Sequence, residues 1–527
     1  HIVRCRYLAQ ALREKGHEIV FVCDLLNAQT ARFLADVFTA EVYQTIPEKW
    51  DAIADAQATL SLLQTKNISP DWVVVDHYFL ETQWEQQIVD AGFQVLAIDD
   101  LVRAHCSDAV LDFKWRGTDP ESAYRGKVSD NTELLLGPQY CLLSPQLRVD
   151  QPNDADANAS IFTVLLSLGG GGDATLLIRL CSELAQFARL NAHAESQPMM
   201  QVQVVVGPLM QAVQSLKEWV AHQQRAPIAI RFIEGKTNLD AKLKACDLYV
   251  GAAGGTLYAL RALGKPAITF SLADNQVTDQ TLLDVIGHYF HLNQFNDDDF
   301  EKLAKWVWLC QQNQQRIQDL FAFREVTIDT LGANRVADFM TTGQITPLPI
   351  CQTRQHQWTE LAGGRRLRVV EDADINHYLA SRNLPENCQN MLNVNPIQPI
   401  DHALWWFSNQ RRSFLMTQAS GEPLMYIWDK LKQVDGQSFL IGGWFVCSGQ
   451  TAFQEAMVAL DWQLKKCAKD YPGIPWIAVI SRQNKYVKLM NDYFGFKEIE
   501  PGGRYYQAVT TLFPKASQQD FFYVYKE

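Results

Sequence analysis

The segment Asp247–Gln276 reads DLYVGAAGGTLYALRALGKPAITFSLADNQ and decides the fold of the chain. A short apolar strand at Leu248–Val250 leads into the small residues GAAGG, and a helix is expected over Thr256–Leu263. Glycines let a ligand approach the backbone closely, and the amides at a helix N-terminus direct partial positive charge toward an anion. The segment therefore predicts a phosphate site after a parallel strand, of the kind that holds the diphosphate of a nucleotide sugar.

The composition of the whole chain agrees with a globular protein of two or three domains: 527 residues, 47% hydrophobic and 20% charged. A net charge of -12 argues against nucleic acid or an anionic membrane as the main partner. Eleven cysteines without a CxxC pair favour a reducing cytoplasm over a disulfide framework or a zinc site. No apolar run reaches the ~20 residues that a membrane helix needs. We expect a cytoplasmic protein with no metal, no nucleic-acid partner and no membrane insertion. Because the chain begins at His1, the sequence does not exclude an upstream signal peptide, and it leaves the oligomeric state open.

Helices alternate with continuously apolar strands in two blocks, 1–150 and 151–342. This pattern is typical of parallel, doubly wound sheets and predicts two Rossmann-like α/β domains with a ligand in the crevice at the strand C-termini. The polar stretch 151–160 (QPNDADANAS) is the expected linker. The expected helices are 3–15, 28–37, 80–91 and 256–263, and the expected strands are 18–23, 72–76, 94–99, 163–168, 201–207, 229–233, 248–250 and 267–271.

A third block follows a connector at 343–364. Residues 365–527 are richer in Trp, Tyr and Asn and mix helical with β-like runs, which predicts an α+β domain.

The first residues, His1 to Leu12 (HIVRCRYLAQAL), resemble the GHxxRCxxLAxxL motif of the pseudaminic-acid pathway hydrolases. These enzymes release UDP from UDP-2,4-diacetamido-2,4,6-trideoxy-β-L-altropyranose. Further segments resemble that family's motifs in the same order: Asp76–Leu80 (DHYxL), Ile98–Leu101 with Arg103 and His105 (IDDLAxRxHxCD), Leu136–Tyr140 (LGPxY) and Ser271–Gln276 (SLADNQ).

The resemblance implies a GT-B fold and a metal-independent, inverting addition of water to C1 of a UDP-sugar, with no cofactor. His1 is then the general base, because imidazole titrates near neutrality. Tyr78 and Asn275 are expected to hold the sugar and the water, and Gly254, Gly255 and Thr256 the diphosphate. The remaining nucleotide-sugar contacts are assigned to Gly170, Gly171, Asp274 and Gln276. Asp99 and Asp100 follow a buried strand, and we interpret them as capping groups at the sheet edge.

Three positions depart from the family pattern. Ala259 stands where the family usually has a ribose-binding Glu, Phe113-Lys114 stands in place of Gln-Asn, and Ser144 replaces an Arg. Two alternatives to the hydrolase therefore stay open: a GT-B glycosyltransferase that uses a nucleotide-activated nonulosonic sugar, and a pseudoenzyme that binds a nucleotide sugar without turnover.

The third block resembles GNAT N-acyltransferases at Asp372–Asn383, His402–Phe407 and Asn484–Phe496. Its acyl-CoA loop, Cys447–Ala452, has one glycine, and Asn491 stands where a Tyr general acid often sits. Ser448, Gly449 and Gln450 are the expected contacts for acetyl-CoA. The domain either acetylates the 4-amino sugar that the first two domains hydrolyse, or keeps the GNAT shape for substrate binding or docking. The family implies a destination in flagellin or surface glycans.

Overall fold

The structure is a computed structural model that describes residues 1–23, 34, 42–44, 51–148, 161–191, 200–207, 209–222, 228–234 and 238–527, with only the backbone of 42–44 and Asn275. These residues form two compact units, unit 1 (His1–Thr353) and unit 2 (Arg354–Glu527). The expected helix 28–37, apart from Leu34, and the expected linker 151–160 lie outside the described residues.

The N-terminal half of unit 1 contains a parallel four-stranded sheet in the order β3-β4-β5-β6. Its strands are β3 (Trp72–Val75), β4 (Gln94–Ile98), β5 (Ala109–Asp112) and β6 (Glu133–Leu136), and β1 (Phe21–Cys23) and β2 (Val42–Gln44) pair separately. The helices are α1 (Ile2–Glu14), α3 (Ala52–Thr65) and α4 (Thr82–Asp90), with short 3₁₀ turns η1 (Pro120–Tyr124), η2 (Pro138–Tyr140) and η3 (Pro145–Leu147).

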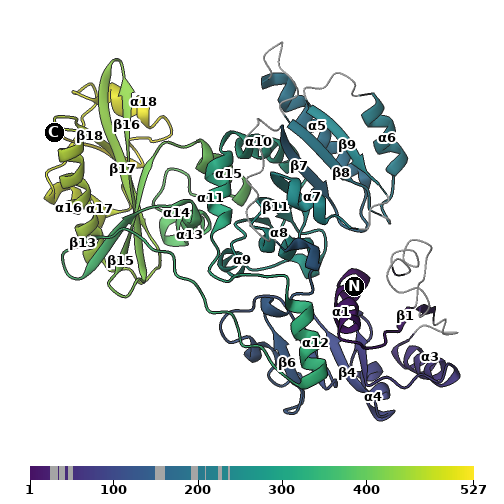
Figure 1. Cartoon of the computed structure of the whole chain (residues 1–527). Coiled ribbons are helices and arrows are strands. Elements are labelled where there is room, and N and C mark those ends of the chain that lie inside the picture. The colour runs from purple at the N-terminus through teal and green to yellow at the C-terminus, as the bar shows by residue number, and fades with distance from the viewer. Residues whose placement is uncertain are drawn as a thin grey trace. The chain divides into compact units, whose positions relative to one another are not determined.

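The C-terminal half of unit 1 contains a parallel six-stranded sheet in the order β12-β11-β10-β7-β8-β9. Its strands β7, β8 and β9 lie side by side in Figure 1. The strands are β7 (Phe162–Ser167), β8 (Met200–Val205), β9 (Ile228–Ile233), β10 (Leu248–Ala252), β11 (Ala267–Phe270) and β12 (Phe290–Leu292). The helices are α5 (Ala174–Asn191), α6 (Val213–Ala221), α7 (Asp240–Ala245), α8 (Thr256–Leu263), α9 (Gln280–Val285), α10 (Asp299–Gln312) and α11 (Gln314–Ala322), with the 3₁₀ turn η4 (Asp274–Gln276).

Strand β10 is longer than the expected 248–250, because it continues through Gly251 and Ala252. A Cβ atom on Gly251 would lie 1.8 Å from the carbonyl oxygen of Ser167 on the neighbouring strand β7. The first glycine of the GAAGG run therefore serves close strand packing, and the turn toward α8 consists of Ala253, Gly254 and Gly255.

The last helix of unit 1, α12 (Gly332–Thr342), returns to the N-terminal half. Its Ala333, Val336 and Phe339 lie in one apolar cluster with Leu8 of α1 and Leu96 of β4. A Cβ atom on Gly332 would lie 2.1 Å from the carbonyl oxygen of Cys141, so the start of α12 packs against the backbone that follows η2.

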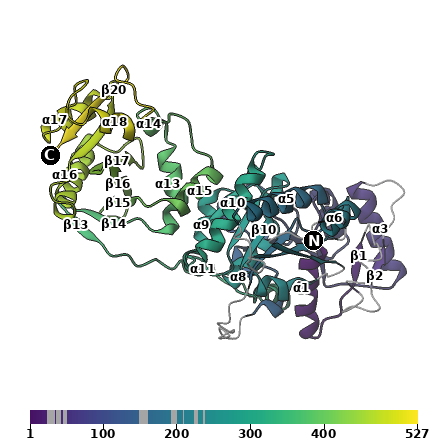
Figure 2. The ribbon, with the colours of Figure 1, turned by 90° about the horizontal axis from the view of Figure 1, so that it is seen from above.

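Unit 2 is built on an eight-stranded mixed sheet in the order β13-β14-β15-β16-β17-β18-β20-β19. Helices α13 and α16 lie on opposite faces of this sheet (Figures 1 and 2). The strands are β13 (Thr359–Leu361), β14 (Arg365–Val369), β15 (Arg412–Gln418), β16 (Pro423–Val434), β17 (Gln437–Val446), β18 (Trp476–Ser481), β19 (Lys497–Glu498) and β20 (Phe521–Lys526). The helices are α13 (Ile375–Arg382), α14 (Pro385–Cys388), α15 (Pro399–Ser408), α16 (Phe453–Asp470), α17 (Lys485–Tyr493) and α18 (Tyr506–Leu512), with the 3₁₀ turn η5 (Asp372–Asp374). The expected connector 343–364 contains a strand, β13, which pairs with β14 in an antiparallel hairpin. The sheet of unit 2 therefore begins inside this connector.

Strands β17 and β18 are parallel but pair at one position only, Leu440 with Trp476. The two strands diverge beyond this pair, which leaves one edge of β17 without a neighbouring strand. The expected fold class is confirmed: a GT-B-like pair of Rossmann-type domains precedes an α+β, GNAT-like domain. None of the helices in the described parts of the chain combines the length and the apolar character that a membrane crossing requires.

Candidate functional site

The candidate site of unit 1 is built at the C-terminal ends of three neighbouring parallel strands. Asp76 follows β3, Asp100 follows β4 by two residues, and Lys114 follows β5 by two residues. The carboxyl ends of parallel strands meet at one edge of the sheet, where α/β proteins place their ligands. His1 reaches the same edge because it immediately precedes α1.

His1, Asp76 and Arg4 form a hydrogen-bonded group at this edge. The Nδ1 atom of His1 contacts Asp76 Oδ1, and Arg4 donates from Nε and Nη2 to the two oxygens of Asp76, at 2.6 Å each. The Asp76 side chain is 3% exposed, whereas that of His1 is 35% exposed. Burial disfavours the charge of Arg4, but the hydrogen bonds to Asp76 and the charges of Asp76 and Asp100 together outweigh this effect and raise the pKa of Arg4 above its usual value. The carboxylate is thus shared between a fixed cation and an accessible imidazole.

Tyr78 and Asp100 extend this group. The Tyr78 ring lies edge-on to the His1 ring at 4.7 Å, and its hydroxyl donates to Asp100 Oδ2 at 3.3 Å. The other carboxylate oxygen of Asp100 is buried and accepts no hydrogen bond from the described residues. Lys114 Nζ and Arg116 Nη2 donate to the backbone carbonyl of Asp100, at 3.0 and 2.9 Å. A buried carboxylate oxygen that receives no donor is able to accept one from a ligand hydroxyl or amide.

Asp99 has a different, structural role. It is 1% exposed and accepts the backbone N–H groups of Leu101 and Arg103, which confirms the interpretation of Asp99 as a capping group. Burial is the largest single effect and opposes the ionisation of Asp99, but the hydrogen bonds from His105, Arg103 and Leu101 together outweigh it and lower the pKa of Asp99. Burial also opposes the charge on His105, yet Asp99 and Glu85 together raise the pKa of His105 to about 9.

The predicted diphosphate residues lie at the matching edge of the second sheet. Gly170 and Gly171 follow β7, Gly254 and Gly255 follow β10, and Thr256 begins α8. Strands β7, β10 and β11 are neighbours, so the glycine segments and the turn η4 lie at the same ends of their strands. A Cβ atom on Gly170, Gly254 or Gly255 would meet no heavy atom within 4 Å, so the backbone there borders open space.

The residues of η4 are less fully described. Asp274 is exposed, and Gln276 Oε1 accepts the N–H of Leu272 at 2.8 Å. The side chain of Asn275 lies outside the described part of the structure. Its predicted role therefore stays a prediction, as do those of the other site residues.

Phe113 connects the two halves of unit 1. The Arg4 guanidinium lies 5.5 Å from the Phe113 ring, and the Tyr258 ring of α8 meets Phe113 edge-on at 5.2 Å. Phe113, Tyr258 and Ala259 belong to one buried apolar cluster. Two of the three departures from the family pattern thus pack in the same cluster. The third, Ser144, donates its hydroxyl to Asp240 of α7 at 2.5 Å and also joins the two halves.

Sequence reasoning did not assign roles to Asp76 or Arg4. Its interpretation of Asp100 as a capping group was wrong, because Asp100 Oδ2 accepts from the Tyr78 and Arg4 side chains and Oδ1 from none of the described groups. Asp76 carried a usable signal, since it is an acidic residue directly after a continuously apolar strand. Arg4 carried a weaker one: it lies three residues after His1, and so one helical turn further along the same face.

The candidate site of unit 2 surrounds the end of β17. Ser448, Gly449 and Gln450 are exposed in the loop between β17 and α16, and the Ser448 hydroxyl accepts the N–H of Gln450 at 3.3 Å. Asn491 donates its side-chain amide to the carbonyl of Val487 on its own helix α17.

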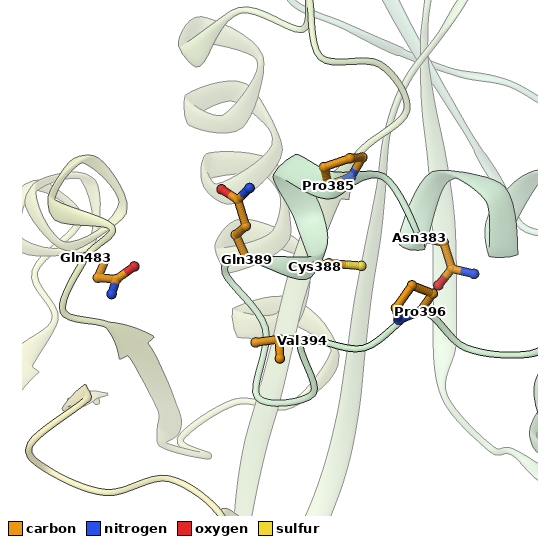
Figure 3. A pocket seen from close by; sticks show the side chains of 7 residues that line it. All are labelled: Asn383, Pro385, Cys388, Gln389, Val394, Pro396 and Gln483. Atoms are coloured by element: carbon orange, nitrogen blue, oxygen red, sulfur yellow. The ribbon is translucent and has the colours of Figure 1, made fainter.

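A cavity of about 530 Å³ lies between α14 and the residue Gln483 beyond β18 (Figure 3). Its lining is neutral: Asn383, Pro385, Cys388, Gln389, Val394, Pro396 and Gln483.

No model of a protein family matches the sequence, and no curated protein does. Solved structures are similar to parts of the chain. MurG from Acinetobacter baumannii has a TM-score of 0.43 at 14% identity over 65% of this chain and 96% of that one. MnaA from S. aureus, solved with UDP, has a TM-score of 0.46 at 10% identity over 67% and 96%. An acetyltransferase from Agrobacterium tumefaciens has a TM-score of 0.25 at 13% identity over 33% and 97%. Similarities of this size carry no inference about activity.

No group of three or more His, Cys, Asp or Glu side chains among the described residues could hold a metal ion.

Proposed function

We propose that unit 1 hydrolyses a nucleotide sugar, releasing UDP from UDP-2,4-diacetamido-2,4,6-trideoxy-β-L-altropyranose with inversion, in the biosynthesis of pseudaminic acid. The observation that carries the proposal is the pair of His1 and Asp76 at the C-terminal edge of the sheet, with the Tyr78 ring against the imidazole. The ordered motifs from His1 to Gln276 support the same reaction class.

Asp76 sets the protonation of His1. A carboxylate only accepts hydrogen bonds, so the Nδ1 atom of His1 carries the proton that it shares with Asp76. The lone pair for catalysis is then on Nε2, which is the arrangement of an imidazole that acts as a general base. Arg4 holds Asp76 in position from the other side of the carboxylate.

In the proposed step, His1 Nε2 takes one proton from water while the water oxygen bonds to C1 of the sugar. The bond between C1 and the diphosphate oxygen breaks, and UDP leaves with that electron pair. Attack opposite the leaving group inverts C1. General-base help of this kind is worth roughly 10²–10⁴-fold in rate. Gly254, Gly255 and Thr256 would bind the diphosphate through backbone amides at the start of α8, and Tyr78 and Asn275 would hold the sugar and the water.

The test is NMR of the full chain with the named UDP-sugar. We expect UDP and a free sugar of inverted anomeric configuration, and we expect His1→Ala to abolish the reaction. His17→Ala is the matched control, since His17 is an exposed histidine that contacts Thr341 instead of the site. Equal turnover by wild type and His1→Ala would refute the role of His1, and no turnover by wild type would refute the hydrolase.

A glycosyltransferase is the second candidate, and one observation favours it. Ala259, at the position of the expected ribose-binding Glu, is 7% exposed and packs in the same cluster as Phe113. An apolar cluster there fits a donor whose nucleotide is held differently from UDP in the resembled family. A transferase would release the nucleotide slowly alone and faster when a sugar or protein hydroxyl is added. A pseudoenzyme would bind the nucleotide sugar with no turnover in either assay.

We propose that unit 2 acts on the same UDP-sugar in the cytoplasm, the compartment that the eleven cysteines without a CxxC pair favour. Acetylation of the 4-amino group with acetyl-CoA is the role that its resemblance implies, and sugar binding without transfer is the alternative. At the end of β17, the N–H and C=O of Val446 are both bonded to the side chain of Asn387, and this contact favours the second role.

A further inference from the structure

The end of β17 presents one backbone edge toward the space between β17 and β18. On one side, Cys447 donates its N–H to Leu424 at the start of β16. On the other side, Leu440 donates its N–H to Pro475, immediately before β18. Because backbone groups alternate sides along a strand, the N–H and C=O of Val446 point to the same side as those of Leu440. At Val446, however, β18 has diverged and supplies no partner.

The side chain of Asn387 occupies this edge. Its Oδ1 accepts the N–H of Val446 at 3.1 Å, and its Nδ2 donates to the carbonyl of Val446 at 2.8 Å. Nδ2 also donates to the carbonyl of Ser381 at 2.6 Å, and Asn387 is 7% exposed. A carboxamide bonded to both groups of one residue acts as a neighbouring strand would act at that position.

The preceding residue, Glu386, reaches the loop after β17. A Cβ atom on Gly449 would lie 2.6 Å from Glu386 Oε1. The carboxylate therefore lies directly against the loop that leads into the N-terminus of α16, an 18-residue helix. The backbone amides and the helix dipole at the N-terminus of α16 would favour an anionic ligand beside this loop, and the Glu386 carboxylate occupies that position.

Acyl-CoA would need both the free backbone edge at the end of β17 and the loop before the N-terminus of α16. Its pantetheine arm is a chain with two amides, which binds a free strand edge as an added strand does, and its diphosphate needs amides at a helix N-terminus. We propose that α14 closes the acyl-CoA groove of unit 2 with the chain's own side chains: Asn387 substitutes for a pantetheine amide, and Glu386 substitutes for the diphosphate. This inference rests on the GNAT-like fold and on the proposed role of unit 2.

The residues that line the neighbouring cavity show the position of α14 relative to β17 and β18. Pro385, Cys388 and Gln389 of this segment line the cavity on one side, and Gln483, two residues beyond β18, lines it on the other (Figure 3). Asn387 is not among the lining residues, since its side chain is directed to β17 instead. Helix α14 thus lies between the diverging strands, with one side toward the cavity and Asn387 on the strand edge.

The test is calorimetric titration of the full chain with coenzyme A and, separately, with S-acetyl-pantetheine, which lacks the diphosphate. We expect wild type to bind neither ligand measurably below about 1 mM. Asn387→Ala frees the strand edge and should tighten binding of both ligands about tenfold or more, by removing two competing hydrogen bonds. Glu386→Gln should tighten coenzyme A alone, about threefold to tenfold at low salt, and the gain should shrink at 0.5 M NaCl.

Glu500→Gln is the matched control, because it removes an exposed carboxylate beyond β19, at the far end of the sheet from β17, and should leave binding unchanged. Hydrogen exchange gives a second readout: the N–H of Val446 should lose protection in Asn387→Ala. Glu386 is exposed, so its variant tests the inference even if Asn387→Ala unfolds.

Micromolar binding by wild type, equal to that of Asn387→Ala, would refute the closed groove and leave a CoA-binding role intact. If neither wild type nor any folded variant bound either ligand, the groove would not be an acyl-CoA site at all, and both ideas would fail. Hydrolysis by unit 1 is measured independently of these outcomes.

Discussion

Asp76→Asn is the perturbation that tests the proposed chemistry most directly. Asn offers one oxygen and one N–H group, whereas Asp76 accepts hydrogen bonds from both His1 and Arg4. If the Asn oxygen stays with Arg4, its N–H faces His1 Nδ1, which must then become an acceptor. The proton moves to Nε2, and the lone pair needed for water is lost.

The magnitude follows from these contacts. Loss of general-base help should lower kcat by roughly 10²–10⁴-fold, which is about 3–5 kcal/mol of transition-state stabilisation. Arg4 is 15% exposed in its side chain and would lose a charged partner, at a cost of about 3 kcal/mol in the free energy of unfolding. UDP affinity should change less than about twofold, because Asp76 and the glycine segments belong to different halves of unit 1.

The assay is a double-mutant cycle on kcat with His1→Ala, Asp76→Asn and the double variant, together with calorimetric UDP binding and urea unfolding. If Asp76 acts through His1, the double variant is no slower than His1→Ala alone. Multiplicative losses in kcat would show that Asp76 acts independently of His1 and would refute the reasoning. Loss of UDP binding in proportion to kcat would show that the effect is structural.

Three further predictions rest on single contacts. Asp99 and Glu85 raise the folded pKa of His105 from 6.5 to about 9, so its stabilisation is complete below pH 6.5 and is lost as pH rises through 9. The difference in unfolding free energy between wild type and His105→Gln, measured in urea, should therefore shrink by up to about 3 kcal/mol over that range, and a constant difference would contradict the assignment. Gly251→Ala should destabilise unit 1 by about 2–4 kcal/mol, because its Cβ would lie 1.8 Å from Ser167 O, whereas Gly254→Ala, with no atom within 4 Å, should stay within about 1 kcal/mol yet weaken UDP binding about tenfold. Tyr78→Phe loses the hydroxyl bond to Asp100 and should lower kcat/KM about tenfold with little change in urea midpoint; an unchanged kcat/KM would remove Tyr78 from the site.

The fold was predictable because its strands are continuously apolar and bounded by small residues. Trp72–Val75, Leu248–Val250 and Ala267–Phe270 are buried or half-buried parallel strands at the expected places. The return of α12 to the first core was not predictable in the same way. An amphipathic period identifies a helix and its apolar face, but it does not say which of two similar cores that face will join.

Sequence motifs suggested which residues belong to the candidate site, but they did not indicate the contacts between residues that are far apart in the chain. His1 and Tyr78 are 77 residues apart, and only the ordered motifs suggested that they belong to one site; the contact between their rings was not predicted. The bond of Asn387 to Val446 spans 59 residues and depends on the divergence of β17 from β18. Neither residue has an unusual neighbourhood in the sequence, so no local pattern could have indicated that contact.

Helix α12 has a consequence for the order in which the protein is made. The core around Leu8 and Leu96 includes Val336 and Phe339, so it lacks one wall until the ribosome has synthesised more than 330 residues. The first Rossmann-type domain is therefore complete only after the second has emerged. We expect that a chain truncated between the two sheets exposes part of its apolar core and aggregates. We also expect the two domains to become stable together during synthesis.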